Sequence, residues 1–151
     1  MRFEQTRDVI DHVGDFHLQA SRLYAELQQH ASNQRVRMLL DYLARHQQSL
    51  AHKILEFKQE TSKVVLNSWF KYTHDEDILK PLQTVDRHSD LDFDAALDLA
   101  VRLDAQLLEL YQEMAERARS SEVKEIFNNL LLREMEEKQK LMHAALGLMD
   151  L

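Results

Sequence analysis

Histidines are the side chains of this chain that most readily bind a metal ion or move a proton near neutral pH. Two histidines four residues apart on a helix would face one metal ion, but the two closest pairs here are separated by five and by six residues. We therefore expect most of them on the surface and no separate histidine metal site. The eight histidines are found at positions 12, 17, 30, 46, 52, 74, 88 and 143.

Composition excludes several other kinds of chemistry. The chain has no cysteine, and therefore no disulfide, thiol nucleophile, zinc–thiolate site or iron–sulfur cluster. A formal net charge of −7, without a basic stripe or a glycine-rich phosphate loop, argues against a nucleic-acid partner. No apolar run reaches the length of a membrane span, and the amino terminus lacks the apolar core of a signal peptide. These features predict a cytoplasmic protein without a membrane partner.

The elements that must position any site are helices. The 151 residues include only two glycines and one proline, and they are rich in strong helix formers such as Leu, Ala, Glu and Gln. This length can bury one continuous core. We therefore predict a single all-α domain over residues 1–151.

An internal repeat organises the chain. When the sequence is shifted by 87 positions, residues 8–55 align without a gap on residues 95–142, and we count nine identities, where chance gives roughly three or four. Tyr24 aligns with Tyr111, and Leu43 aligns with Leu130. The repeat predicts two copies of one helical hairpin.

Apolar residues at spacings of three, four and seven indicate two amphipathic helices in each copy. Short breaks near residues 31–33 and 120–121 make both pairs antiparallel hairpins. We expect the first hairpin over about 6–60, a crossover over about 61–92 and the second hairpin over about 93–147, where Gly147 would end the last helix. One long crossover between two hairpins is the connectivity of ferritin-like four-helix bundles.

The crossover begins with an apolar, aromatic cluster and continues with an acidic stretch. The acidic part, residues 73–94, has seven acidic residues against two basic ones and contains the only proline, Pro81. The apolar cluster is either a lid on the bundle or a patch that binds a partner. Its members are Val64, Val65, Leu66, Trp69, Phe70 and Tyr72.

The four helices, roughly 100 residues, resemble the rubrerythrin-like branch of the ferritin-like superfamily. That resemblance rests on the paired tyrosines Tyr24 and Tyr111 and on the repeated steps Leu43-Ala44 and Leu130-Leu131. Members build a di-iron site in the bundle core, where each half supplies a Glu seven residues before the tyrosine and a Glu-x-x-His after the step. The resemblance implies a ferritin-like fold with six positions for metal ligands.

The residues at those six positions depart from the family pattern. The first half holds His17, Gln47 and Leu50, and the second half holds Asp104, Glu134 and Glu137. A di-iron site needs about four carboxylates and two imidazoles, whereas Leu50 cannot ligate and Gln47 is a weak neutral ligand. Only Glu134 matches the pattern, so the resemblance implies a di-iron site that has been lost.

We expect His17, Gln47, Asp104 and Glu134 to face the bundle axis at a similar height, with Leu50 and Glu137 one turn away. One interpretation is that His17, Asp104, Glu134 and Glu137 hold a single iron, manganese or zinc ion, as in a protein of iron handling or peroxide defence. The alternative, which we favour, is a polar layer whose members satisfy one another.

The sequence thus favours a non-catalytic ferritin-like protein with no cofactor, which acts by binding itself or an unidentified protein partner. A symmetric homodimer is expected, because the chain has more apolar residues than one four-helix seam requires, notably Val65, Leu66, Trp69 and Phe70. The sequence identifies neither a substrate nor a pathway.

Overall fold

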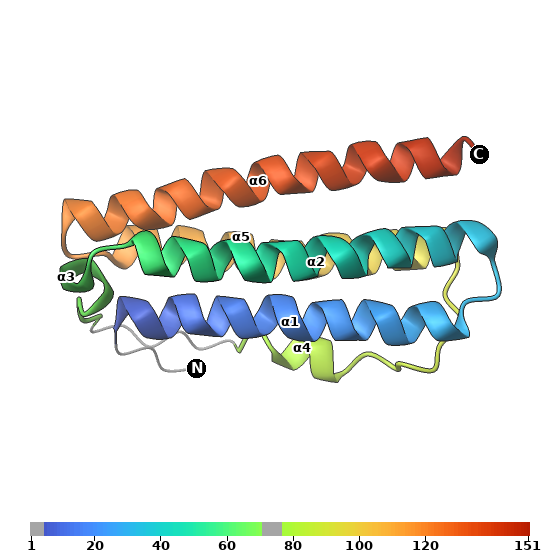
Figure 1. Cartoon of the computed structure of the whole chain (residues 1–151), viewed down its shortest axis with the longest axis horizontal. Helices are drawn as coiled ribbons and strands as arrows, with labels where there is room; N and C mark the ends of the chain where they lie inside the picture. The colour runs from blue at the N-terminus through green and yellow to red at the C-terminus, as the bar shows by residue number, and fades with distance from the viewer. Residues whose placement is uncertain (1–4, 71–76) are drawn as a thin grey trace.

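The computed structural model describes residues 5–70 and 77–151 and forms an elongated bundle of four long helices (Figure 1). The long helices are α1 (Thr6–His30), α2 (Gln34–Glu60), α5 (Phe93–Arg117) and α6 (Ser121–Met149). Two short helices, α3 (Lys63–Leu66) and α4 (Lys80–Gln83), belong to the connection between α2 and α5. The predicted fold class, two antiparallel hairpins joined by a long crossover, is confirmed.

The helix boundaries follow the repeat. Adding 87 to the bounds of α1 gives those of α5, and adding 87 to the first residue of α2 gives that of α6. The two second helices are also capped at equivalent positions: the Asn33 side chain accepts from the backbone N–H of Arg35 and Val36, and Ser120 accepts from Val123. A side-chain oxygen at this position satisfies amide groups that have no partner inside the helix.

The core lies along the seam shared by the four long helices. Its largest fully buried side chains come from both hairpins, so the two halves enclose one apolar interior. Packing within each hairpin is more extensive than packing between hairpins, as expected for helices joined by short loops. Representative members are Phe16, Leu23, Leu40, Leu107 and Phe127.

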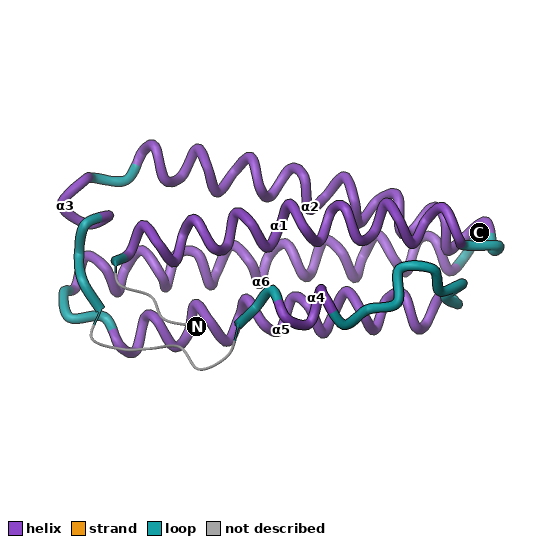
Figure 2. Tube along the Cα trace, turned by 90° about the horizontal axis from the view of Figure 1, so that it is seen from below, coloured by secondary structure: helices purple, strands orange, loops and turns teal. Residues whose placement is uncertain are grey.

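The crossover starts at α3, at one end of the bundle, and returns past α4 to the opposite end, where α5 begins (Figure 2). Val65, Leu66 and Phe70 are buried, and the Phe70 ring meets that of Phe127 edge to face with 5.8 Å between centroids. Val64 and Trp69, by contrast, are 78% and 61% exposed. Half of the apolar cluster is therefore a lid on the bundle. Tyr72 lies outside the described residues.

The last helix ends later than expected. Gly147 was predicted to stop α6, but the helix continues to Met149 and Asp150 is its C-cap. A glycine ends a helix well when it adopts a positive φ, and no described glycine does so. In the part of the chain that the structure describes, no helix is long and apolar enough to cross a membrane.

Candidate functional site

The bundle core contains a polar layer at mid-length. His17 on α1, Gln47 on α2, Asp104 on α5 and Glu134 on α6 are only 2%, 3%, 6% and 5% exposed. Each of the four long helices thus contributes one buried polar side chain to this layer, as the ligand-position alignment predicted. We call these four residues the polar layer.

A short hydrogen bond links the two members from the first hairpin. Nδ1 of His17 donates to Oε1 of Gln47 across 2.7 Å, because an amide oxygen can only accept. Burial lowers the pKa of His17 to about 4, so this imidazole is neutral at physiological pH. His17 is therefore fixed in one tautomer by a neutral partner.

The two members from the second hairpin are carboxyl groups that hold protons unusually well. Burial, and after it the nearby charges of Asp104 and Glu137, raise the pKa of Glu134 to about 8. Burial likewise raises the pKa of Asp104 to about 7, a shift that Lys138 opposes and Glu137 reinforces. Charged carboxylates this close and this poorly solvated repel each other, so near neutral pH the pair retains protons.

Both repeat-related tyrosines lie beside this layer. Tyr24 and Tyr111 are almost fully buried. The pKa of each hydroxyl is raised, first by burial and then by a neighbouring carboxylate, Asp104 for Tyr24 and Glu134 for Tyr111. Each tyrosine therefore stays neutral next to a carboxyl group of the second hairpin.

Glu137 lies at the edge of the layer, close to two lysines and one histidine. Its carboxylate is 3.4 Å from Nε2 of His46, 3.7 Å from Nζ of Lys53 and 3.3 Å from Nζ of Lys140. Lys53 and Lys140 are equivalent positions of the repeat. The charge of Glu137 is thus balanced by side chains of the protein.

Leu50, which occupies an imidazole position of the family pattern, lines a cavity of about 270 Å³ with His17, Glu134 and Glu137. The cavity wall also includes Tyr111. The structure therefore brings three of the four predicted metal-site residues to one cavity, while Asp104 is not part of its lining.

The six positions supply fewer metal-ligating side chains than two iron ions require. No group of three or more His, Asp or Glu side chains that could hold a metal ion occurs among residues 5–70 and 77–151. Within the same ranges, no fully buried side-chain nitrogen or oxygen lacks a hydrogen-bond partner. Of the side chains at the six positions, Leu50 offers no donor atom and Gln47 already accepts from His17.

Besides His17, two further histidines are partly or fully buried, although we expected most histidines on the surface. His46 stacks on Tyr42 with 5.6 Å between ring centroids and reaches Glu137. His12 is 7% exposed, and its Nε2 lies 3.1 Å from Oδ1 of Asp77 in the crossover. Helical spacing could have signalled His12, because it lies three residues after Val9 on the buried face of α1.

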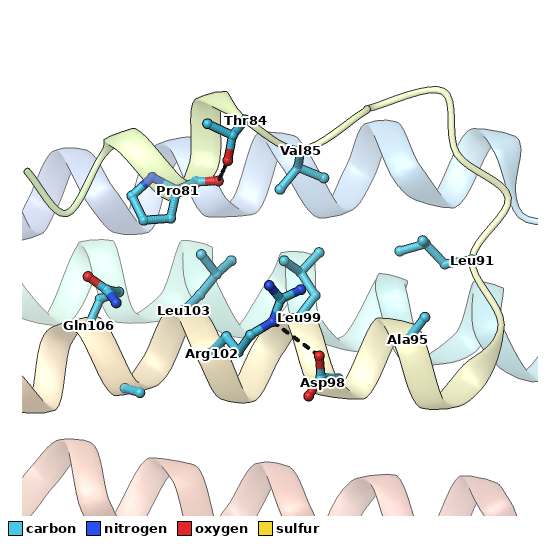
Figure 3. A pocket seen from close by; sticks show the side chains of 11 residues that line it. Pro81, Thr84, Val85, Leu91, Ala95, Asp98, Leu99, Arg102, Leu103 and Gln106 are labelled. Carbon is cyan, nitrogen blue, oxygen red and sulfur yellow. Dashed lines mark hydrogen bonds and ion pairs between the residues drawn. The ribbon is translucent and has the colours of Figure 1, made fainter.

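A larger cavity, of about 600 Å³, lies outside the bundle core, between the crossover and α5 (Figure 3). Val85 and Leu91 of the crossover face Leu99 of α5 across it, and Arg102 pairs with Asp98 at its edge. None of the polar-layer residues lines it. The two charged side chains that line it, Asp98 and Arg102, are paired with each other, 3.1 Å apart.

Comparison with known proteins supports the fold. No protein-family model matches the chain, and no curated protein matches its sequence significantly. A solved structure of an inferred ferritin-like diiron-carboxylate protein from Thermotoga maritima is similar, with a TM-score of 0.60 and 18% identity over 96% of this chain and 97% of that one. At this identity the likeness shows a ferritin-like helical fold.

Proposed function

We propose that this chain is a non-catalytic ferritin-like protein that has lost the di-iron site and acts by self-association or by binding a protein partner in the cytoplasm. The observation that carries the proposal is the pairing of side chains at the six ligand positions. His17 bonds to Gln47, Leu50 is apolar, and Glu137 is balanced by Lys53 and Lys140 and lies beside the imidazole of His46.

The difference between the two hairpins at these positions supports the loss of the di-iron site. The six positions form three pairs related by the repeat: His17 with Asp104, Gln47 with Glu134, and Leu50 with Glu137. In every pair the first hairpin has a neutral or apolar side chain and the second has an acid. Two metal ions need carboxylates from both hairpins, because bridging ligands must reach both ions. The first hairpin supplies none at these positions.

The protonation of the layer is compatible with a structural role. Burial raises the pKa of Asp104 and Glu134 to about 7 and 8 in the metal-free protein. Such a pair can remain buried near neutral pH without a metal ion, because protonation removes most of the cost of burying charge.

Metal content is the direct test. We expect wild-type protein, purified without chelator and then offered ferrous iron or manganese, to contain neither metal in stoichiometric amount by elemental analysis. Two ions per chain, lost on substitution Glu134→Gln, would overturn the proposal.

A redesigned variant tests the same idea in the other direction. Restoring the pattern with His17→Glu, Gln47→Glu, Leu50→His, Asp104→Glu and Glu137→His should create affinity for iron or manganese. It should also lower the stability of the metal-free form by several kcal/mol, since four carboxylates would then share a poorly solvated core. Equal stability of the metal-free variant and the wild type would contradict the assignment of these positions to the core.

The second candidate is a protein that holds one iron, manganese or zinc ion for iron handling or peroxide defence. The observation in its favour is the cavity that His17, Glu134 and Glu137 share. The diiron-carboxylate description of the structurally similar Thermotoga protein also favours it. One ion per chain in the elemental analysis, dependent on both His17 and Glu134, would select this candidate.

A further inference from the structure

α6 carries apolar side chains on two faces. One face, with Phe127, Leu130 and Leu141, is buried in the bundle. A second set points away from it and remains exposed in the single chain. This outer row consists of Leu132 (58% exposed), Met135 (48%), Met142 (36%), Leu146 (58%) and Met149 (46%).

The outer row has the spacing of a coiled-coil seam. Successive members are three, seven, four and three residues apart, which corresponds to the a and d positions of consecutive heptads with Gln139 in the remaining position. A row of this kind on an outer helix is apolar surface that packs best against another helix of the same pattern. Figure 1 shows α6 along one edge of the bundle, where a second molecule can reach it.

We propose that the outer row is the contact surface of a homodimer in which α6 of one copy packs antiparallel against α6 of a second copy. This proposal deepens the proposed function, because it names the surface and the partner through which the chain self-associates. A twofold axis between Gln139 and Met142 places Met135 against Leu146 of the second copy, and Leu132 against Met149.

Charges beside the row favour the antiparallel arrangement. In a parallel coiled coil, the g positions of one helix lie beside the e positions of the other. This places Lys138, at a g position, beside His143 of the second copy, at an e position. In an antiparallel coiled coil, the e positions of one helix lie beside the e positions of the other. This places Glu136 of each copy beside His143 of the other copy, so that the contact occurs twice. Glu136 and His143 are both exposed in the single chain, and a carboxylate can accept a hydrogen bond from an imidazole N–H.

The size of the row predicts a weak, concentration-dependent dimer. From Leu132 to Met149 it extends for about 26 Å, and a helix with its side chains is about 10–12 Å wide. The contact is therefore about 300 Å² on each copy, below the roughly 800 Å² of a standard stable interface. We expect the dimer to dissociate on dilution.

Other exposed apolar residues offer smaller surfaces. Trp69 lies near the end of α3 with Val64 as its exposed neighbour, and Leu18 and Leu55 flank the groove between α1 and α2. Neither pair continues as a row along a helix. These positions supply matched controls, since Leu55 is 52% exposed and resembles Leu146 in type and exposure.

Sedimentation equilibrium from low micromolar to near-millimolar concentration tests the proposal. Wild type should pass from monomer to dimer, and Met135→Glu or Leu146→Lys should each abolish the dimer without loss of helical content. The double variant Met135→Glu/Leu146→Lys should recover part of the association, because the two new charges face each other only in the antiparallel register. Leu55→Lys and Trp69→Ser should dimerise like wild type.

Cysteine cross-linking fixes the register, since the chain has no cysteine of its own. A mixture of Met135→Cys and Leu146→Cys proteins should form mainly the mixed disulfide dimer under mild oxidation. Dominant self-cross-linking of Met135→Cys would overturn the antiparallel arrangement. A dimer abolished by Trp69→Ser or Leu55→Lys but not by Leu146→Lys would overturn the α6 surface while leaving self-association intact. If the wild-type protein is monomeric at every concentration, both the α6 contact surface and self-association itself are overturned.

Discussion

At the scale of single residues, the hydrogen bond between His17 and Gln47 should stabilise the fold only while both partners are present. Gln47→Leu leaves a buried imidazole N–H without its acceptor, and we expect a loss of about 1–3 kcal/mol in the free energy of unfolding. The double variant His17→Leu/Gln47→Leu removes both polar groups and should be closer to wild type than Gln47→Leu alone. Urea unfolding of wild type, His17→Leu, Gln47→Leu and the double variant measures this cycle. Additive losses would mean that the two side chains do not interact.

The sequence located the polar layer but not the contacts that satisfy it. Alignment of the repeat and the family resemblance placed His17, Asp104 and Glu134 in the core, and all three are buried. The spacing could not show that Glu137 contacts His46, because that contact joins residues far apart on two helices. Such a contact depends on the relative rotation of packed helices, which periodicity does not determine.

At the scale of elements, the apolar cluster of the crossover has buried and exposed members. Substitutions at two adjacent members, Phe70 and Trp69, should therefore differ in their effect on stability. Phe70→Ala should cost about 3 kcal/mol of unfolding free energy, because the ring is buried against Phe127 and its removal leaves a cavity. Trp69→Ala should change the stability by less than about 0.5 kcal/mol, since most of that side chain is exposed. Thermal or urea unfolding distinguishes the two. Equal losses would contradict the description of Phe70 as a lid.

The long helices could be predicted closely, whereas the crossover could not. α1 begins and ends at the expected residues, because the apolar periodicity and the break after His30 are strong local signals. The path of the crossover depends on contacts between distant residues, such as His12 with Asp77 and Phe70 with Phe127. A resemblance between residues 8–55 and 95–142 carries no information about the segment between them.

At the scale of the whole molecule, two sets of buried groups make stability depend on pH in opposite directions. Burial lowers the pKa of His12, His17 and His46. The folded state therefore resists protonating them, and the free energy of unfolding decreases as pH falls below their ordinary pKa of 6.5. Burial raises the pKa of Asp104 and Glu134, so stability is lost as pH rises from their ordinary values toward about 7 and 8. The two effects oppose each other between about pH 4.5 and 6.5, and only the carboxyl effect remains above that range.

We therefore expect the unfolding free energy to fall by about 1–3 kcal/mol between pH 6.5 and 8, since each extra proton held by the folded state corresponds to about 1.4 kcal/mol per pH unit. Glu134→Gln removes the more strongly shifted group and should flatten this decline. The matched control, Glu125→Gln, changes an exposed side chain on the same helix and should retain the decline. Urea titrations at several pH values compare the three proteins. An equal decline in wild type and Glu134→Gln would show that Glu134 is already ionised in the folded protein, and the protonated polar layer would then have to be abandoned.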